Sequence, residues 1–174
     1  MVSVFSALTA LGAFIKIPIP YVPFTLQFLF CAMAGIVLGP KLGALSQALY
    51  VLIGLIGIPV FTEGGGLYYI FKPTFGYLIG FIIAAYIIGM LSRKFENLTF
   101  VKTLLCVLSG LFFVYLFGVM HLYIIYNLYI GEAKTINWAI FYGFIICVGG
   151  DILVSMAASA LSLKLKPIAK FGQE

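Results

Sequence analysis

The sequence has 174 residues, of which 64% are hydrophobic and 9% are charged, and its 10 Lys and Arg outnumber its 5 Asp and Glu. A soluble domain carries roughly 25% charged residues, so this composition excludes a soluble enzyme, a disordered segment and a basic nucleic-acid-binding protein. It predicts a polytopic membrane protein, with the lipid bilayer as its surroundings and its excess positive charge in loops beside an anionic membrane surface.

Apolar runs separated by proline, glycine or charge predict the membrane-spanning helices. One span needs about 20 apolar residues, so the chain has room for about five or six spans and for no extramembrane domain. We therefore expect an all-α fold of six transmembrane helices in a single membrane domain, residues 1–174. In chain order the expected spans are 3–16, 24–39, 42–58, 74–92, 103–128 and 136–163.

The distribution of positive charge predicts the orientation in the membrane. With the N-terminus in the cytoplasm, three basic residues lie outside and the other seven inside, as the positive-inside rule favours. The three outside are Lys16, Lys72 and Lys134, and the seven inside are Lys41, Arg93, Lys94, Lys102, Lys164, Lys166 and Lys170. Both termini are thus expected in the cytoplasm, with segments 16–23, 60–73 and 129–135 on the outer side.

Small residues at four-residue spacing let membrane helices approach closely. The pairs Gly35–Gly39, Gly76–Gly80 and Ala85–Gly89 are best interpreted as packing within the bundle. The first helix differs because its small face is continuous. This face makes it the best candidate for docking a partner membrane protein, and it consists of Ser3, Ser6, Ala7 and Ala10.

The sequence lacks the motifs of an enzyme. It has no Gly-x-x-x-x-Gly-Lys-Ser/Thr for nucleotide binding and no Gly-x-Ser-x-Gly turn for a serine hydrolase. Its one histidine, His121, has no clustered second metal ligand, and we interpret it as a hydrogen-bonded interior side chain. We expect no catalytic residue, no metal and no cofactor.

Asp151 is the one acid inside an expected span, where a charge is costly and marks a functional candidate. Gly149 and Gly150 precede it and let another group approach the helix closely. It is either a packing acid bonded to a neighbouring helix or a hydrogen-bond acceptor for a ligand. We favour the ligand, because no partner cation is evident in the sequence.

The loop 60–73 is the second candidate site. Its glycines permit unusual backbone angles and expose N–H groups, while the aromatic residues around them suit a flat ligand. An aromatic belt at the membrane interface is the alternative. Lys72 and Lys16 could attract an anionic group. The polar helix-start residues that face the same outer cavity are Thr25, Gln27, Thr74 and Tyr77. Such a pocket suits an organic solute and not a bare ion.

Several segments resemble one family over essentially the whole chain. They are VPFTLQ at 22–27, AG at 34–35, LGPKLG at 38–43, GIPVF at 57–61, PTFGYLIGF at 73–81 and GD at 150–151. On these residues the chain resembles the BioY family, the biotin-specific substrate-binding components of energy-coupling-factor (ECF) transporters.

The resemblance implies a six-helix component in a prokaryotic cell membrane, with biotin bound near the outer surface. Its implied partners are an ECF transmembrane coupling subunit and a pair of ABC ATPase subunits. In family members the acid at the Asp151 position accepts from the ureido N–H groups, and a polar residue beside the loop glycines, here Glu63, contributes. Many members carry a lysine where this chain has Val154, which leaves Lys72 or backbone N–H groups to meet the biotin carboxylate.

The expected substrate-binding set combines residues of the loop, the helix starts and the last span. Its members are Asp151, Glu63, Gly64, Gly65, Phe61, Gln27, Tyr77, Tyr68 and Lys72. The alternatives are a component for a different vitamin or heterocycle, a facilitator that works without an ATPase, and a small intramembrane enzyme.

Overall fold

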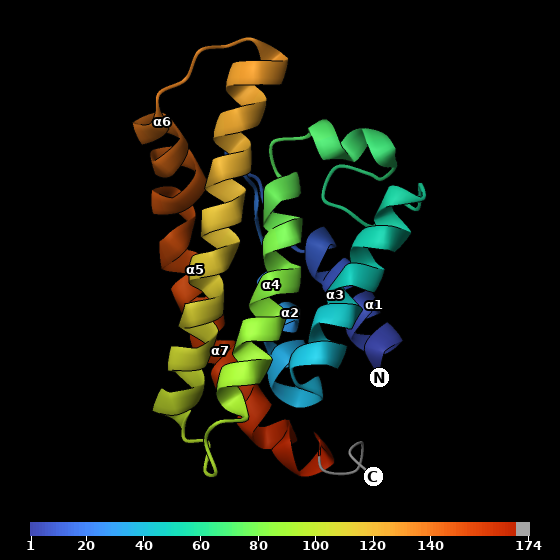
Figure 1. Cartoon of the computed structure of the whole chain (residues 1–174), viewed down its shortest axis with the longest axis vertical. Coiled ribbons are helices and arrows are strands. Elements are labelled where there is room, and N and C mark those ends of the chain that lie inside the picture. Colours follow the sequence, from blue (N-terminus) through green and yellow to red (C-terminus); the bar gives the residue numbers. More distant parts are fainter. Residues whose placement is uncertain (170–174) are drawn as a thin grey trace.

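The computed structural model describes the backbone of residues 1–169 and the side chains of residues 1–165. Within this range it confirms an all-α bundle of six helical segments (Figure 1). They are α1 (Val2–Phe14), α2 (Gln27–Leu38), α3 (Pro40–Leu55), α4 (Phe75–Ser92), α5 (Phe100–Ile124) with a π-helical turn (Ile125–Ile130), and a last segment of α6 (Ile136–Ile140), a π-helical turn (Phe141–Ile145) and α7 (Ile146–Ala169). The Lys166 side chain and Lys170 lie outside the described residues.

The first three helices are shorter than the last three. By length and composition, Phe75–Ser92, Phe100–Ile130 and Ile136–Leu165 could each cross a membrane, whereas α1, α2 and α3 have 13, 12 and 16 residues. The spans expected from the sequence extend beyond the ends of α1, α2 and α3, because they include residues that form a ribbon or a turn. Residues after α1 form a two-stranded antiparallel ribbon, β1 (Lys16–Ile17) with β2 (Phe24–Thr25), in which Lys16 pairs with Thr25.

Glycines with a left-handed backbone set the turns of this half of the chain. Gly39, at φ 81°, separates α2 from α3, and Pro40 then occupies the first turn of α3, where its missing N–H costs nothing. Gly57, at φ 110°, ends the turn after α3. The short 3₁₀ helix Leu67–Phe71 follows and leads into α4.

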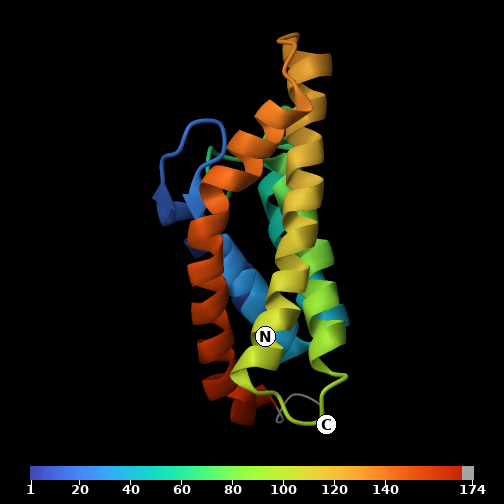
Figure 2. The ribbon, with the colours of Figure 1, turned by 90° about the vertical axis from the view of Figure 1, so that its left-hand side faces the viewer.

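The connections lie at two opposite ends of the bundle (Figures 1 and 2). The N-terminus, the α2–α3 turn and the α4–α5 connection lie at the lower end in Figure 1, and α7 descends to the same end. Residues 56–74 and 131–135 lie at the upper end. Four basic residues lie at or next to these lower connections: Lys41 at the start of α3, Arg93 and Lys94 after α4, and Lys102 at the start of α5. Positive charge therefore gathers at this end of the molecule.

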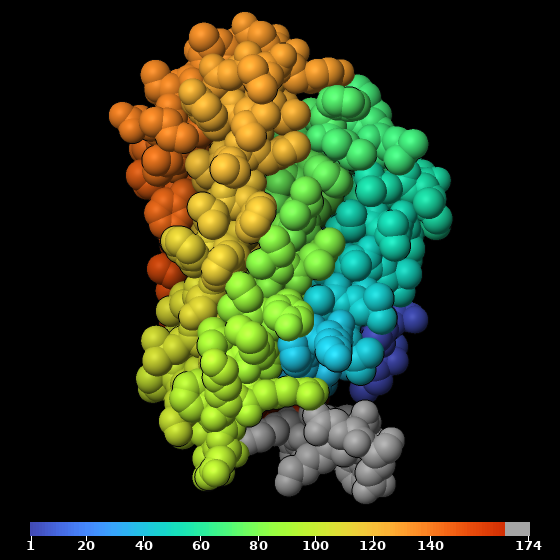
Figure 3. Space-filling view, in the orientation of Figure 1, coloured from blue at the N-terminus to red at the C-terminus, as the bar shows by residue number. Residues whose placement is uncertain are grey.

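Helix α4 packs along α5 through two glycines. A Cβ on Gly80 would lie 2.7 Å from Val114 Cα, and one on Gly76 would lie 2.5 Å from the Phe117 carbonyl oxygen. Such contacts leave no room for a side chain, which agrees with the interpretation of this pair as internal packing. Figure 3 shows the two helices side by side along this face.

Candidate functional site

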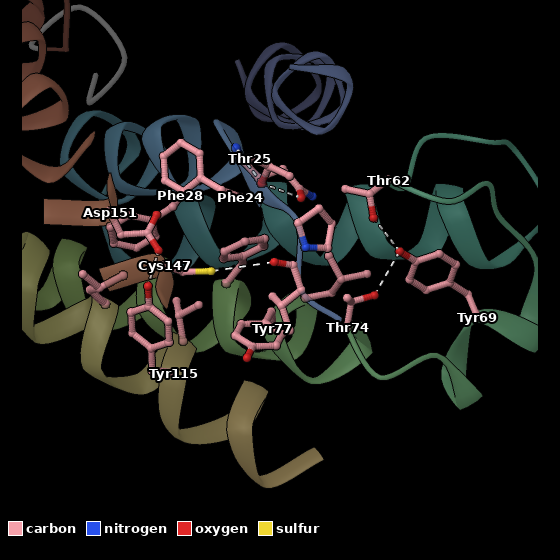
Figure 4. Close-up of a pocket in the computed structure, with 17 residues that line it drawn as sticks. Phe24, Thr25, Phe28, Thr62, Tyr69, Thr74, Tyr77, Tyr115, Cys147 and Asp151 are labelled. Atoms are coloured by element: carbon pink, nitrogen blue, oxygen red, sulfur yellow. Dashed lines mark hydrogen bonds between the residues drawn. The ribbon is translucent and has the colours of Figure 1, made fainter. Parts of the chain in front are cut away.

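A cavity lies among α2, α4, α5 and α7 and is covered by residues 22–25 and Thr62 (Figure 4). It encloses about 580 Å³ free of protein atoms, part of it open to the outside. Eight of its 17 lining residues have apolar side chains. The other nine carry a polar group, and they are Thr25, Gln27, Thr62, Tyr69, Thr74, Tyr77, Tyr115, Cys147 and Asp151.

One end of the cavity, which we call the acid end, consists of Asp151 and Tyr115. The Tyr115 hydroxyl on α5 donates to Asp151 Oδ2 on α7. Among the described side chains, no Lys or Arg pairs with this carboxylate. Asp151 is thus bonded to a neighbouring helix, as one of the two interpretations from the sequence expects, and it also lines the cavity.

The opposite end, which we call the hydroxyl end, consists of Thr62, Tyr69 and Thr74 (Figure 4). The Tyr69 hydroxyl lies 2.9 Å from Thr62 Oγ1 and 3.2 Å from Thr74 Oγ1. Burial raises the pKa of the Tyr69 hydroxyl, so the side chain stays neutral and keeps its proton to donate.

A second polar chain fixes the start of α2 against α3. Thr25 Oγ1 donates to Gln27 Oε1 at 3.0 Å, and Gln27 Nε2 donates to the Tyr50 hydroxyl at 2.8 Å. The Tyr50 hydroxyl in turn donates to the Val60 carbonyl at 3.0 Å. These bonds hold Thr25 and Gln27 in the cavity wall and join that wall to the loop after α3.

Residues 22–25, which cover the cavity, belong to the segment 16–25, and this segment is fastened at both sides. Lys16 Nζ donates to the Thr62 carbonyl oxygen at 2.7 Å. On the other side, Tyr21, the only described non-glycine residue with positive φ (71°), packs on Trp138 and Tyr142 with ring centroids 4.9 and 4.8 Å away. Figure 2 shows the connection of the ribbon beside the upper part of the last helical segment.

Three of the nine expected substrate-binding residues line the cavity: Asp151, Gln27 and Tyr77. The Tyr77 hydroxyl donates to the Gly143 carbonyl at 2.8 Å, so its proton is already used within the protein. Thr25 and Thr74, expected at the same cavity as helix-start residues, also line it.

The other six expected residues lie outside this lining: Phe61, Glu63, Gly64, Gly65, Tyr68 and Lys72. Phe61 is buried instead against Tyr50 and Tyr69, where its ring fills the space left by Gly54. The Tyr68 side chain is 64% exposed.

The remaining loop residues among these six serve the loop itself. Glu63 and Lys72 form an ion pair with 3.0 Å between Oε2 and Nζ, and this contact raises the pKa of the lysine. Gly64 closes a tight turn with Phe61, and Gly65 packs against the backbone after α3, with no room for a Cβ beside the Ile58 carbonyl. These four residues therefore serve the structure of the loop, whereas Thr62 and Tyr69 of the same loop line the cavity.

Four polar lining residues were missed from the sequence: Thr62, Tyr69, Tyr115 and Cys147. Tyr69 and Tyr68 are neighbours, and only the 3₁₀ turn decides which of them points inward. Tyr115 lies 36 residues from Asp151, so no local pattern relates them.

The predicted docking residues gather at one surface groove. Ser3, Ser6, Ala7 and Ala10 of α1 line it together with residues of α3 such as Leu49 and Ile53. The groove is almost entirely apolar, as expected for a surface that faces lipid or another membrane protein.

His121 of α5 is half-buried and lies beside Gly76 of α4. Its Nε2 atom is buried and has no hydrogen-bond partner among the described residues, and its ring lies 5.8 Å from that of Phe75. Among the described side chains, no group of three His, Cys, Asp or Glu residues could hold a metal ion.

A family model described as the BioY family matches residues 1–171. The chain belongs to the BioY family. The fit covers almost the full sequence, so the BioY match includes both the cavity and the groove on α1.

Two curated BioY proteins are similar over nearly the whole chain. A probable biotin transporter BioY of Lysinibacillus sphaericus is 42% identical over 165 residues, which are 95% of this chain and 84% of that protein. The biotin transporter BioY of Thermotoga maritima is 40% identical over 166 residues, or 95% and 93%. Membership of this family and the apolar helices indicate a prokaryotic membrane protein.

A solved structure has the same fold. The crystal structure of the S-component for biotin from an ECF-type ABC transporter superposes with a TM-score of 0.84 at 25% identity, covering 95% of this chain and 88% of that chain. The bundle of this BioY family member is therefore an S-component fold.

Proposed function

We propose that this protein binds biotin with high affinity and is the substrate-specific subunit of an ECF-type ABC transporter. The observation that carries the proposal is the cavity with Asp151 in its wall, bonded to Tyr115 and to no described cation. The named relatives support biotin as the ligand.

The cavity suits biotin in polarity. The fused ring system is compact and apolar on its thioether side, which matches the aromatic wall around Phe24, Phe28 and Tyr77. Its ureido group has two N–H donors, which match the carboxylate of Asp151. A hydrogen bond to a charged group contributes about 1.5–3 kcal/mol, so this one acid can dominate selectivity.

The chain is proposed to bind its solute and to leave energy conversion to its partners, because it has no nucleotide-binding motif of its own. We propose that the groove of Ser3, Ser6, Ala7 and Ala10 docks on an ECF transmembrane coupling subunit. A pair of ABC ATPase subunits then drives the cycle. The protein is on this view no enzyme, and biotin binding needs no cofactor.

We further propose that the whole chain, residues 1–174, works as one domain in the cytoplasmic membrane of a prokaryote, with both termini in the cytoplasm. Support comes from the basic residues of the α2–α3 and α4–α5 connections, which share one end of the bundle with the N-terminus (Figure 1). The cavity cover then lies on the outer side, where the solute arrives.

Calorimetry or native mass spectrometry of the purified protein with biotin tests the ligand. Saturable one-to-one binding of biotin supports the proposal. Binding of another vitamin in place of biotin would overturn biotin as the ligand and would leave the fold assignment unchanged. Uptake by cells with and without the coupling and ATPase subunits tests the partners. Equal uptake in both would show a facilitator that works alone.

A further inference from the structure

The two polar ends of the cavity differ in the hydrogen bonds they can offer. Figure 4 places Asp151 and Tyr115 at one side of the cavity and Thr62, Tyr69 and Thr74 at the other, with Phe24 and Tyr77 between them. The acid end offers a carboxylate, which only accepts. A ligand therefore meets different chemistry at its two ends.

The hydroxyl end has one hydrogen-bond donor that no protein group uses. Its three hydroxyl groups carry three protons, and the two contacts that join them, at 2.9 and 3.2 Å, use two. One O–H is left for an acceptor in the cavity. Either atom of each pair can donate, so the direction in which the two hydrogen bonds run decides which of the three hydroxyl groups keeps the free proton.

Gln27 adds a second free donor to the cavity wall. Its amide has two protons, and one of them goes to the Tyr50 hydroxyl. Thr25 and Tyr50 use their own protons on Gln27 and on the Val60 carbonyl. The free donors that remain beyond the acid end thus belong to one hydroxyl and one amide.

The charged residues around the cavity also favour an acceptor group of the ligand at the hydroxyl end. Lys16 Nζ lies 2.7 Å from the carbonyl oxygen of Thr62, so an ammonium stands directly behind the hydroxyl end. Lys72 lies two residues before Thr74, although its charge is balanced by Glu63. The opposite end carries the negative charge of Asp151, so an anionic group is favoured at the hydroxyl end and disfavoured at the acid end.

No cation lines the cavity itself among the described residues. Val154, one helical turn after Asp151, is buried and is absent from the lining. An anionic group of the ligand must therefore be bound by neutral donors, with Lys16 acting through the backbone of Thr62.

We propose that the hydroxyl end, Thr62, Tyr69 and Thr74, binds the carboxylate of the ligand and so fixes its orientation. The inference rests on the proposed function, because it takes biotin as the ligand. The ureido group then lies at the acid end, the thioether ring lies against the aromatic wall, and the valerate chain points toward Tyr69. Selection for a carboxylate comes from neutral hydroxyl donors and not from an ion pair.

The test compares biotin with biotinamide, in which a neutral carboxamide replaces the carboxylate. Tyr69→Phe removes the hydroxyl and keeps the ring that packs on Phe61. It should weaken biotin binding about tenfold and biotinamide binding clearly less. Lys16→Met should also weaken biotin more than biotinamide, and added salt should reduce that difference.

Tyr68→Phe is the matched control, because Tyr68 is the neighbouring tyrosine, 64% exposed and outside the lining. It should leave both affinities unchanged. Thr74→Val, of nearly the same shape, repeats the comparison if Tyr69→Phe does not fold. An equal loss for both ligands, or no loss, overturns the carboxylate assignment while biotin binding by the unchanged protein still supports the proposed function. If the unchanged protein binds no biotin, the proposed function itself is wrong, and the assignment with it.

Discussion

Tyr115 of α5 donates its hydroxyl proton to Oδ2 of Asp151 on α7. The bond joins two helices across the cavity wall and orients the carboxylate with a neutral partner. Oδ1 makes no hydrogen bond with the described residues, so one oxygen of the acid is available to a ligand. A cation in place of the tyrosine would compete with the ligand for the charge.

Asp151→Ala or Asp151→Leu should weaken biotin binding at least roughly tenfold, about 1.4 kcal/mol, because the ureido donors lose their acceptor. Calorimetry on the purified variants measures the loss. Tyr115→Phe should cause a smaller loss, since the carboxylate remains and only its orienting bond is removed. Unchanged affinity in a folded Asp151 variant would remove this residue from the site.

Glu63→Gln and Lys72→Met should change biotin affinity by no more than about twofold, because an exposed ion pair contributes little and both residues lie outside the cavity lining. The same calorimetric titration measures both. A tenfold loss in either variant would show that the loop closes further over the ligand and would restore the role expected from the sequence.

Tyr21→Ala should speed biotin release roughly tenfold, because the ring contacts that fasten the cavity cover are lost. Residues 22–25 line the cavity, so a ligand that leaves on this side must displace them. Chase of bound labelled biotin measures the rate. Tyr21→Phe keeps the ring and should behave as the original protein, and an unchanged rate in Tyr21→Ala would place the exit elsewhere.

Ala7→Trp should abolish ATP-driven uptake and leave biotin affinity within about twofold, because the groove and the cavity are separate sites. The indole would fill the groove between α1 and α3. Leu116→Trp, on the exposed face of α5, is the control and should keep uptake. Normal uptake in Ala7→Trp would mean that the coupling subunit docks on another surface.

Gly80→Ala should lower stability by about 1–3 kcal/mol, the usual cost of overpacking, because its methyl group would push α4 away from Val114. Gly149→Ala is the matched control, since a Cβ there meets nothing within 4 Å. Thermal unfolding in detergent compares the two variants. Equal midpoints would show that α4 and α5 can separate at no cost.

The fold could be predicted from the sequence because its signals are local. Apolar runs, prolines and glycines identify the six helical segments, and the lengths of the first three were overestimated only where a ribbon and tight turns interrupt apolar sequence. Hydrophobicity alone cannot separate a helix end from an apolar strand such as Phe24–Thr25.

The site could be predicted only where a residue is unusual for its surroundings. Asp151 stands out as a charge within an apolar helix, and Gln27 as an amide at the start of one. Tyr115 and Tyr69 do not stand out, because tyrosine is common in this chain and its direction depends on tertiary packing. Phe61 and Tyr68 were expected at the ligand for their aromatic character, which the loop uses for its own packing and for its exposed surface.

The cavity wall is contributed by residues from Val22 to Asp151. During synthesis the first helices enter the membrane long before α7, and a chain that stops before residue 147 lacks both Cys147 and Asp151. The complete cavity wall is thus absent from every chain that stops before Asp151 and forms only when α7 inserts. Retention of biotin would then report on the insertion of α7, so ligand binding can distinguish the full-length protein from products truncated before this residue.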